Sequence, residues 1–151
     1  PHVGLPCGAP LNRRHHMAGV WKILSAAPVE RATLYNNLNE NFRASVPSRR
    51  SLHTTTYRIS RDQVLLLTAN LGPRGGGEIR LNMAGLGLTG SYAVTELRAQ
   101  PGGPLVRRAR GVTSDGVIRL PTLDRYAYIG HRLQRLPARR GARRPCIMPA
   151  V

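Results

Sequence analysis

The sequence has few aromatic residues, two cysteines and no long hydrophobic segment. Aromatic residues make up only 5% of the chain, so few large side chains could anchor a core or stack on bases. No apolar run approaches the roughly 20 residues of a membrane-spanning helix, and we expect no membrane span. Cys7 and Cys146 could form one disulfide, but a single pair makes no disulfide framework. Whether they are bonded stays open.

Acidic residues and lysine are also scarce, and the chain is strongly basic. The formal net charge is +16, and Lys22 is the single lysine, so almost every positive charge is an arginine. Arginine suits bidentate contact with phosphate, and the charge favours binding to nucleic acid or another polyanion. An arginine excess can equally reflect a GC-rich coding sequence. Both explanations remain open.

A chain of 151 residues is one domain, or one domain with an extension. It starts at Pro1 without an initiator methionine or a signal-peptide pattern, so we expect a processed or partial piece of a longer protein. We divide it into a loop and helical lead-in (1–50), a β-domain (51–136) and an arginine-rich tail (137–151). The tail can bury little surface and is expected to be extended or disordered.

The lead-in carries the helical pattern. Met17, Val20, Trp21 and Leu24 follow i, i+3, i+4, i+7 spacing and predict a helix over 17–26, with the only tryptophan as a core anchor. A second short helix is predicted over 29–38, because Pro28 suits a first helical turn.

The stretch from Gln63 to Asn82 is the centre of the predicted β-domain. Its continuous apolar run, 64–67, is typical of a strand covered on both faces. The glycine-rich segment 72–77 predicts a turn, and the alternation over 78–82 predicts a second, half-exposed strand. Together these features predict a β-hairpin.

Further short strands are predicted between turn signals. They cover 53–59, 91–98, 105–106, 117–120 and 126–133. This spacing is typical of an antiparallel β-sandwich, and the absence of alternating long helices argues against a parallel sheet. The expected fold is therefore mainly β, an antiparallel sandwich preceded by a short helical segment.

No residues assemble a recognisable catalytic or metal site. The seven acids are scattered, and no two form the facing pair that a glycosidase needs. His131 reads as a core-edge histidine, and the adjacent His15 and His16 lack the i, i+4 spacing of a helical metal site. Neither a nucleophile elbow nor a phosphate loop is present. We expect no catalytic residues, no metal and no cofactor in this chain.

Arginine pairs are the candidate binding residues. Without interleaved aromatic residues, any contact with nucleic acid would address phosphates rather than bases. The candidates are Arg13, Arg14, Arg49, Arg50, Arg107, Arg108, Arg110, Arg139, Arg140, Arg143 and Arg144.

Several segments resemble the end of a glycoside hydrolase-type barrel and the small carboxy-terminal β-sandwich that follows it. The barrel exit is matched by 20–24 and by Pro28-Val29 with Leu34-Tyr35. The sandwich is matched by 56–58, 63–72, 90–97 and a closing strand near 128–133. Catalytic acids of that family belong to the barrel, and none maps onto this chain.

The resemblance implies a non-catalytic accessory module whose partner is a catalytic barrel domain, or another protein, upstream of Pro1. The compartment stays open, with an extracellular location expected for this reading. The charge departs from the usual near-neutral accessory sandwich, which leaves an alternative. In that alternative the chain is a basic subunit of a ribonucleoprotein or other polyanionic assembly, with RNA as a partner and arginine pairs contacting phosphates.

Overall fold

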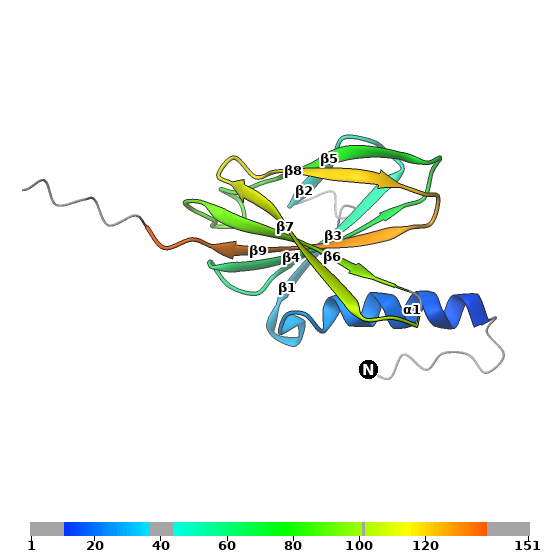
Figure 1. The fold of residues 1–151 in the computed structure, drawn as a ribbon. Helices are drawn as coiled ribbons and strands as arrows, with labels where there is room; N and C mark the ends of the chain where they lie inside the picture. The colour runs from blue at the N-terminus through cyan, green and yellow to red at the C-terminus, as the bar shows by residue number, and fades with distance from the viewer. Residues whose placement is uncertain (1–10, 37–43, 101, 139–151) are drawn as a thin grey trace, which may run out of the picture.

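The computed structural model describes residues 11–36, 44–100 and 102–138, with the backbone alone for 11–16 and Asn36. The chain folds into three layers: one helix, a six-stranded sheet and a three-stranded sheet (Figure 1). The helix α1 spans Leu11–Leu24, and a 3₁₀ helix, η1, spans Val29–Arg31. No helix in these ranges is long and apolar enough to cross a membrane.

Both sheets are antiparallel throughout. The larger sheet has, in spatial order, β1 (Thr33–Asn36), β3 (Leu52–Arg58), β4 (Gln63–Asn70), β9 (Tyr128–Arg135), β6 (Tyr92–Ala99) and β7 (Leu105–Thr113). The smaller sheet has β2 (Ser45–Pro47), β5 (Gly75–Leu81) and β8 (Val117–Leu123). The predicted fold class, a mainly β antiparallel sandwich with one short helix before it, is confirmed. The predicted tail lies almost entirely outside the described residues.

The main core lies between the two sheets. Strand residues alternate between the two faces of a sheet, and on β6 this places Tyr92 and Val94 toward the smaller sheet. They pack there with Ile118 of β8 and with Leu66 and Leu133 from neighbouring strands. Burying each such side chain contributes roughly 1.5–3 kcal/mol, so this interface dominates the stability of the fold.

The opposite face of the larger sheet is covered by α1. Ile23 is fully buried against Leu65 and Leu97 of the sheet. A side chain at Gly130 would meet Ile23 at 2.4 Å, so this glycine lets the helix approach β9 closely. Strand β4 is therefore covered on both faces, as its apolar run predicts, and its residues Val64, Leu65 and Leu66 are all inaccessible.

The predicted hairpin over 63–82 is wrong, because β4 and β5 belong to different sheets. The buried amide of Asn70 ends β4 by donating to the carbonyl oxygens of Pro73 (2.9 Å) and Leu123 (3.1 Å). These bonds join the chain at its crossing to the opposite sheet. The segment Gly75–Gly77, expected in a turn, is the first part of β5.

Two expectations for the lead-in are also wrong. Trp21 is 51% exposed, and Ile23 and Leu24 fill the core position expected for it. The predicted helix over 29–38 is a single 3₁₀ turn followed by β1, because pairing with β3 gives these residues sheet hydrogen bonds instead. Both β1 and β2 lie before residue 51, in the segment for which the pattern predicts a helical lead-in.

Candidate functional site

Strand β7 is a long, arginine-rich strand at one edge of the larger sheet. Among the described strands it pairs with β6 alone, and every residue from Val106 to Val112 is exposed. The sequence predicted a strand only at 105–106. Its continuation to Thr113 was missed because Arg107, Arg108 and Arg110 interrupt the apolar pattern. An edge strand needs no apolar alternation, since solvent can reach both of its faces.

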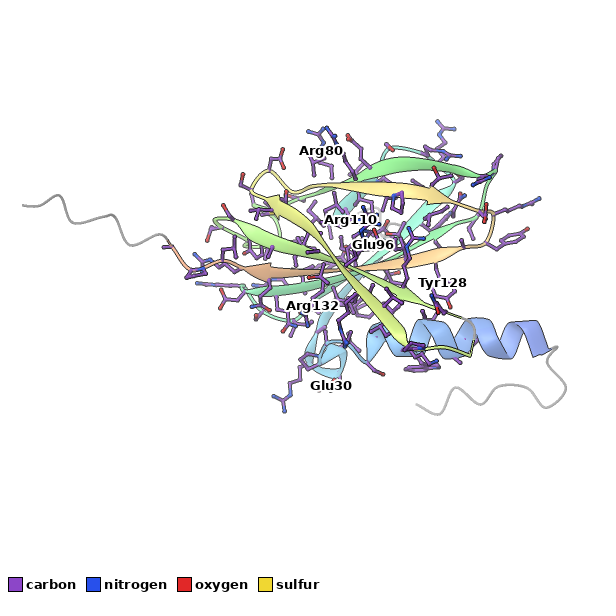
Figure 2. The ribbon with its side chains drawn as sticks, in the orientation of Figure 1. Glu30, Arg80, Glu96, Arg110, Tyr128 and Arg132 are labelled. Carbon is purple, nitrogen blue, oxygen red and sulfur yellow. The ribbon has the colours of Figure 1, made fainter. Side chains whose placement is uncertain are left out.

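A β-bulge redirects Arg110. Val94 of β6 lies opposite Gly111 and Thr95 lies opposite Ala109, so Arg110 has no residue opposite it. Gly111 adopts φ +110°, a conformation that other residues rarely take. Bulges often re-aim a side chain, and this one lets Arg110 turn toward Glu96 in the sandwich interior (Figure 2).

Glu96 is a buried acid held by two arginines. Its side chain is 3% exposed, and Arg98 donates to Oε1 at 2.6 Å. Arg110 donates from Nε to Oε2, and its Nη2 forms an ion pair with the same oxygen, leaving Nη1 without a partner among the described residues. Burial raises the pKa of Glu96, but the hydrogen bonds from Arg98 and Arg110 outweigh it, so the pKa lies below its ordinary value. Glu96 therefore stays ionised and fixes Arg110.

His131 lies next to this acid but is sealed from solvent. In the sheet it pairs with Leu66 on one side and Glu96 on the other, and it is completely buried. Neither ring nitrogen has a hydrogen-bond partner within the described chain. Burial lowers the pKa of His131 to about 4, against the opposing effect of Glu96. The ring is therefore neutral and out of reach of a substrate.

The turn between β7 and β8 is rigid. Thr113 Oγ1 donates to Asp115 Oδ1 (3.0 Å), and the same oxygen accepts the backbone N–H of Val117 (3.0 Å). The Val117 bond is the main cause of a lowered pKa at Asp115. Gly116 adopts φ +77°, and a Cβ added to it would lie 2.9 Å from the carbonyl oxygen of Leu81. Asp115 thus orders the turn, a common role of Asp in turns.

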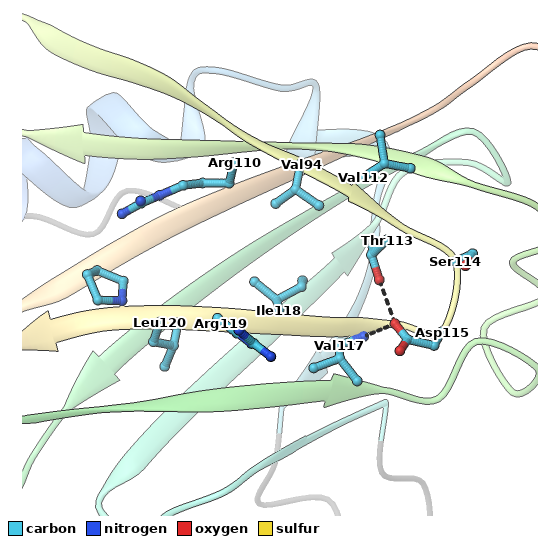
Figure 3. Close-up of a pocket in the computed structure, with 11 residues that line it drawn as sticks. Val94, Arg110, Val112, Thr113, Ser114, Asp115, Val117, Ile118, Arg119 and Leu120 are labelled. Carbon is cyan, nitrogen blue, oxygen red and sulfur yellow. Dashed lines mark hydrogen bonds between the residues drawn. The ribbon is translucent and has the colours of Figure 1, made fainter.

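Beyond this turn, β7 and β8 diverge and enclose an open groove of about 650 Å³ (Figure 3). Both strands are edges of their own sheets, so the groove runs along the open side of the sandwich. Val94, Ile118 and Leu120 form an apolar floor, and Arg110 and Arg119 supply positive charge. The groove thus combines apolar surface, guanidinium groups and two strands that have no neighbouring strand on this side within the described part of the chain.

The structure brings together only some of the arginines that the sequence analysis selected. Arg107, Arg108 and Arg110 share β7. Arg49 instead donates to the carbonyl oxygens of Gly76 (3.1 Å) and Pro73 (3.3 Å), which gives it a structural role, and Arg50 is exposed in the neighbouring turn. The remaining candidates are Arg13 and Arg14, whose side chains are not described, and Arg139, Arg140, Arg143 and Arg144, which lie outside the described residues.

Glu96 and Arg119 are the site residues that the sequence did not single out. Glu96 could have been found by its position, because Tyr92, Val94 and Glu96 alternate onto one face of a predicted strand. An acid in the series of inward residues signals a buried, paired charge. No comparable signal marks Arg119, since its role depends on the divergence of β7 and β8.

No family model, curated protein or solved structure matches this chain.

Proposed function

We propose that this chain is a non-catalytic interaction module, the accessory β-sandwich of a carbohydrate-active protein of the glycoside hydrolase type. The observation that carries the proposal is that every described carboxylate already has a structural partner. The sandwich with a helix before it is the architecture that the resemblance implies, and partner binding is left as the role of the exposed arginine-rich edge.

The carboxylates are occupied one by one. Four of them form ion pairs at the surface: Glu30 with Arg31 (4.0 Å), Asp62 with Arg135 (3.3 Å), Glu78 with Arg80 (3.6 Å) and Asp124 with Arg74 (3.1 Å). Glu96 is bound by two arginines, and Asp115 orders a turn. Figure 2 shows Glu30 well away from Glu96. A glycosidase needs two carboxyl groups that face each other across the substrate. Because each described carboxylate is bound to another group, the contacts support the view that the described chain has no such pair.

The isolated chain is expected to hydrolyse no glycoside. A panel of chromogenic α- and β-glycosides measures this directly, with Asp124→Asn and Glu96→Gln as matched variants. Residual turnover from a contaminating enzyme would be equal in all three proteins. Turnover that disappears in either variant would overturn the proposal, because it would assign that acid a catalytic role.

A second function, contact with a polyanion, is favoured by one observation. Three arginines near this edge have no carboxylate partner within the described chain. They are Arg107 and Arg108 on β7 and Arg119 beside the groove. Unpaired guanidinium groups on one edge suit an RNA backbone or a sulfated polysaccharide.

Salt dependence tests this second function. Each phosphate contact lowers log affinity by roughly 0.9 per unit of log salt on duplex DNA, and by less on single strands. If β7 binds phosphates, the double variant Arg107→Gln with Arg108→Gln should bind an RNA oligonucleotide with a flatter slope of log affinity against log salt. The change should correspond to the loss of about one phosphate contact or more. Arg31→Gln with Arg50→Gln removes the same charge elsewhere and serves as the control. Equal slopes for both double variants would exclude β7 from polyanion binding.

A further inference from the structure

We infer that the open edge of β7 binds an acidic, extended segment of another polypeptide, which adds to the larger sheet as a seventh strand. This inference rests on the proposed function and deepens it, since it names the class of partner. It uses the edge, the bulge and the groove together. The partner would carry acidic side chains on one face and apolar side chains on the other.

Within the described chain, the backbone of β7 has one side that is free to pair with another strand. The stretch from Leu105 to Ala109 pairs regularly with β6, and no described strand pairs with its other side. In an edge strand, every second residue directs its N–H and C=O away from the sheet. A five-residue ladder of this kind is a template for an added strand, which is one of the recurring modes of peptide recognition.

The side chains of β7 give the added strand a preferred face. By register, Arg108 lies opposite Glu96, on the groove side, and Arg110 turns to the same side. By register, Ala109 and Val112 lie opposite Thr95 and Ala93, so their side chains belong to the other face of the strand. Val112 also borders the groove and is 61% exposed. Acids on the groove side would therefore meet Arg108 and the free Nη1 of Arg110, while apolar side chains would cover Val112.

Charge excludes the most obvious competitor, a second copy of this chain. Two β7 strands paired edge to edge would bring together six arginines and no acid, because the strand reads Leu-Val-Arg-Arg-Ala-Arg-Gly-Val-Thr. Like charges on paired strands are destabilising, and charged edges are a known guard against self-pairing. The same charges attract an acidic strand, so the edge is selective.

The chain's own undescribed segments do not supply such a strand. Residues 1–10 and 139–151 contain no Asp or Glu, and residues 37–43 contain only Glu40. The groove beyond the bulge has room for a continuation of the bound segment, because its apolar floor and Arg119 extend along β8. A partner strand could thus run from the β7 ladder into the groove.

Titration with synthetic peptides of about ten residues tests the inference. The probe alternates Glu and Val. Two modified forms carry N-methyl groups on all Glu amides or on all Val amides, which leaves the charge unchanged. Only one set of amides can face β7 when Glu occupies the groove side. We expect the unmodified peptide and one methylated form to bind equally, and the other form to bind at least tenfold more weakly.

Two single variants locate the site. Arg108→Gln should weaken binding of the unmodified peptide about fivefold, as expected for an exposed ion pair. Arg107→Gln removes the same charge from the opposite face of the same strand and should change affinity less than twofold. Equal effects of the two variants would contradict the proposed face.

Equal binding of both methylated peptides, or of a heparin fragment of the same charge, would overturn strand addition and leave charge attraction as the explanation. Failure of every peptide to bind would also overturn it. Neither outcome affects the proposed non-catalytic function, which fails only if the glycoside assay detects turnover that disappears in Asp124→Asn or Glu96→Gln.

Discussion

Replacing His131 with leucine is expected to remove most of the acid sensitivity of this fold. The native protein should lose about 3 kcal/mol of unfolding free energy between pH 7 and pH 4, and His131→Leu should lose far less over that interval. At pH 7 the variant should be as stable as the native protein or more stable. Leucine has no ring nitrogens that must be buried without partners.

Acid should destabilise the fold because folding lowers the pKa of His131. The pKa of His131 is about 4 in the folded protein, below its ordinary value of about 6.5. Between these values the unfolded chain binds more protons than the folded chain, so acid favours unfolding. The part of the unfolding free energy that depends on a neutral His131 is fully present above pH 6.5 and is lost as the pH falls toward 4. Arg98 and Arg110 face the ring and oppose its protonation, whereas Glu96 favours it.

Urea unfolding at pH 7, 6, 5 and 4 measures the effect, with the unfolding free energy extrapolated to water at each pH. The lowered pKa of Glu96 acts in a lower window, below its ordinary value near 4.5, so the two contributions can be separated. Parallel pH profiles of the native protein and the His131→Leu variant would show that His131 does not cause the acid sensitivity of the fold.

Removing Glu96 is expected to produce the second large effect. Glu96→Ala should destabilise the fold by about 2 kcal/mol, because it leaves the guanidinium groups of Arg98 and Arg110 without their anion. The loss is smaller than for a fully buried pair, since the two arginines are 45% and 31% exposed and can reach water. For a domain of this size, the melting temperature should fall by roughly 4–8 °C.

Glu78→Ala is the matched control for this prediction. Glu78 pairs with Arg80 at 3.6 Å, and both side chains are substantially exposed. Surface pairs contribute roughly 0–1 kcal/mol, so this variant should melt within about 2 °C of the native protein. Equal melting temperatures for Glu96→Ala and Glu78→Ala would show that the buried pair does not stabilise the sandwich.

Local patterns in the sequence predicted the class of the fold and its most buried strand. The apolar run 64–67 predicted a strand covered on both faces, and β4 is that strand. The strand predicted over 91–98 is β6, Tyr92–Ala99. In these strands the burial of a residue depends on residues close to it in the sequence. Hydrophobic periodicity reports on such local relations, so it could predict these strands.

The pairing of strands could not be predicted in the same way. A glycine-rich segment between two strands is compatible with a hairpin and with a crossing between sheets. The choice depends on Asn70, whose amide bonds to carbonyl groups from both the nearby Pro73 and the distant Leu123. Likewise, the groove exists only because β7 and β8 move apart with distance from the turn that contains Gly116. No local pattern in the sequence marks this divergence.

Hydrogen exchange along β7 tests most directly the central claim, that this chain acts by binding at its arginine-rich edge. Exchange is followed with and without the alternating Glu and Val peptide. We expect slower exchange in Leu105–Ala109 and no change in β1, the other edge of the same sheet. Unchanged exchange in β7, or equal protection of β1 and β7, would contradict this claim.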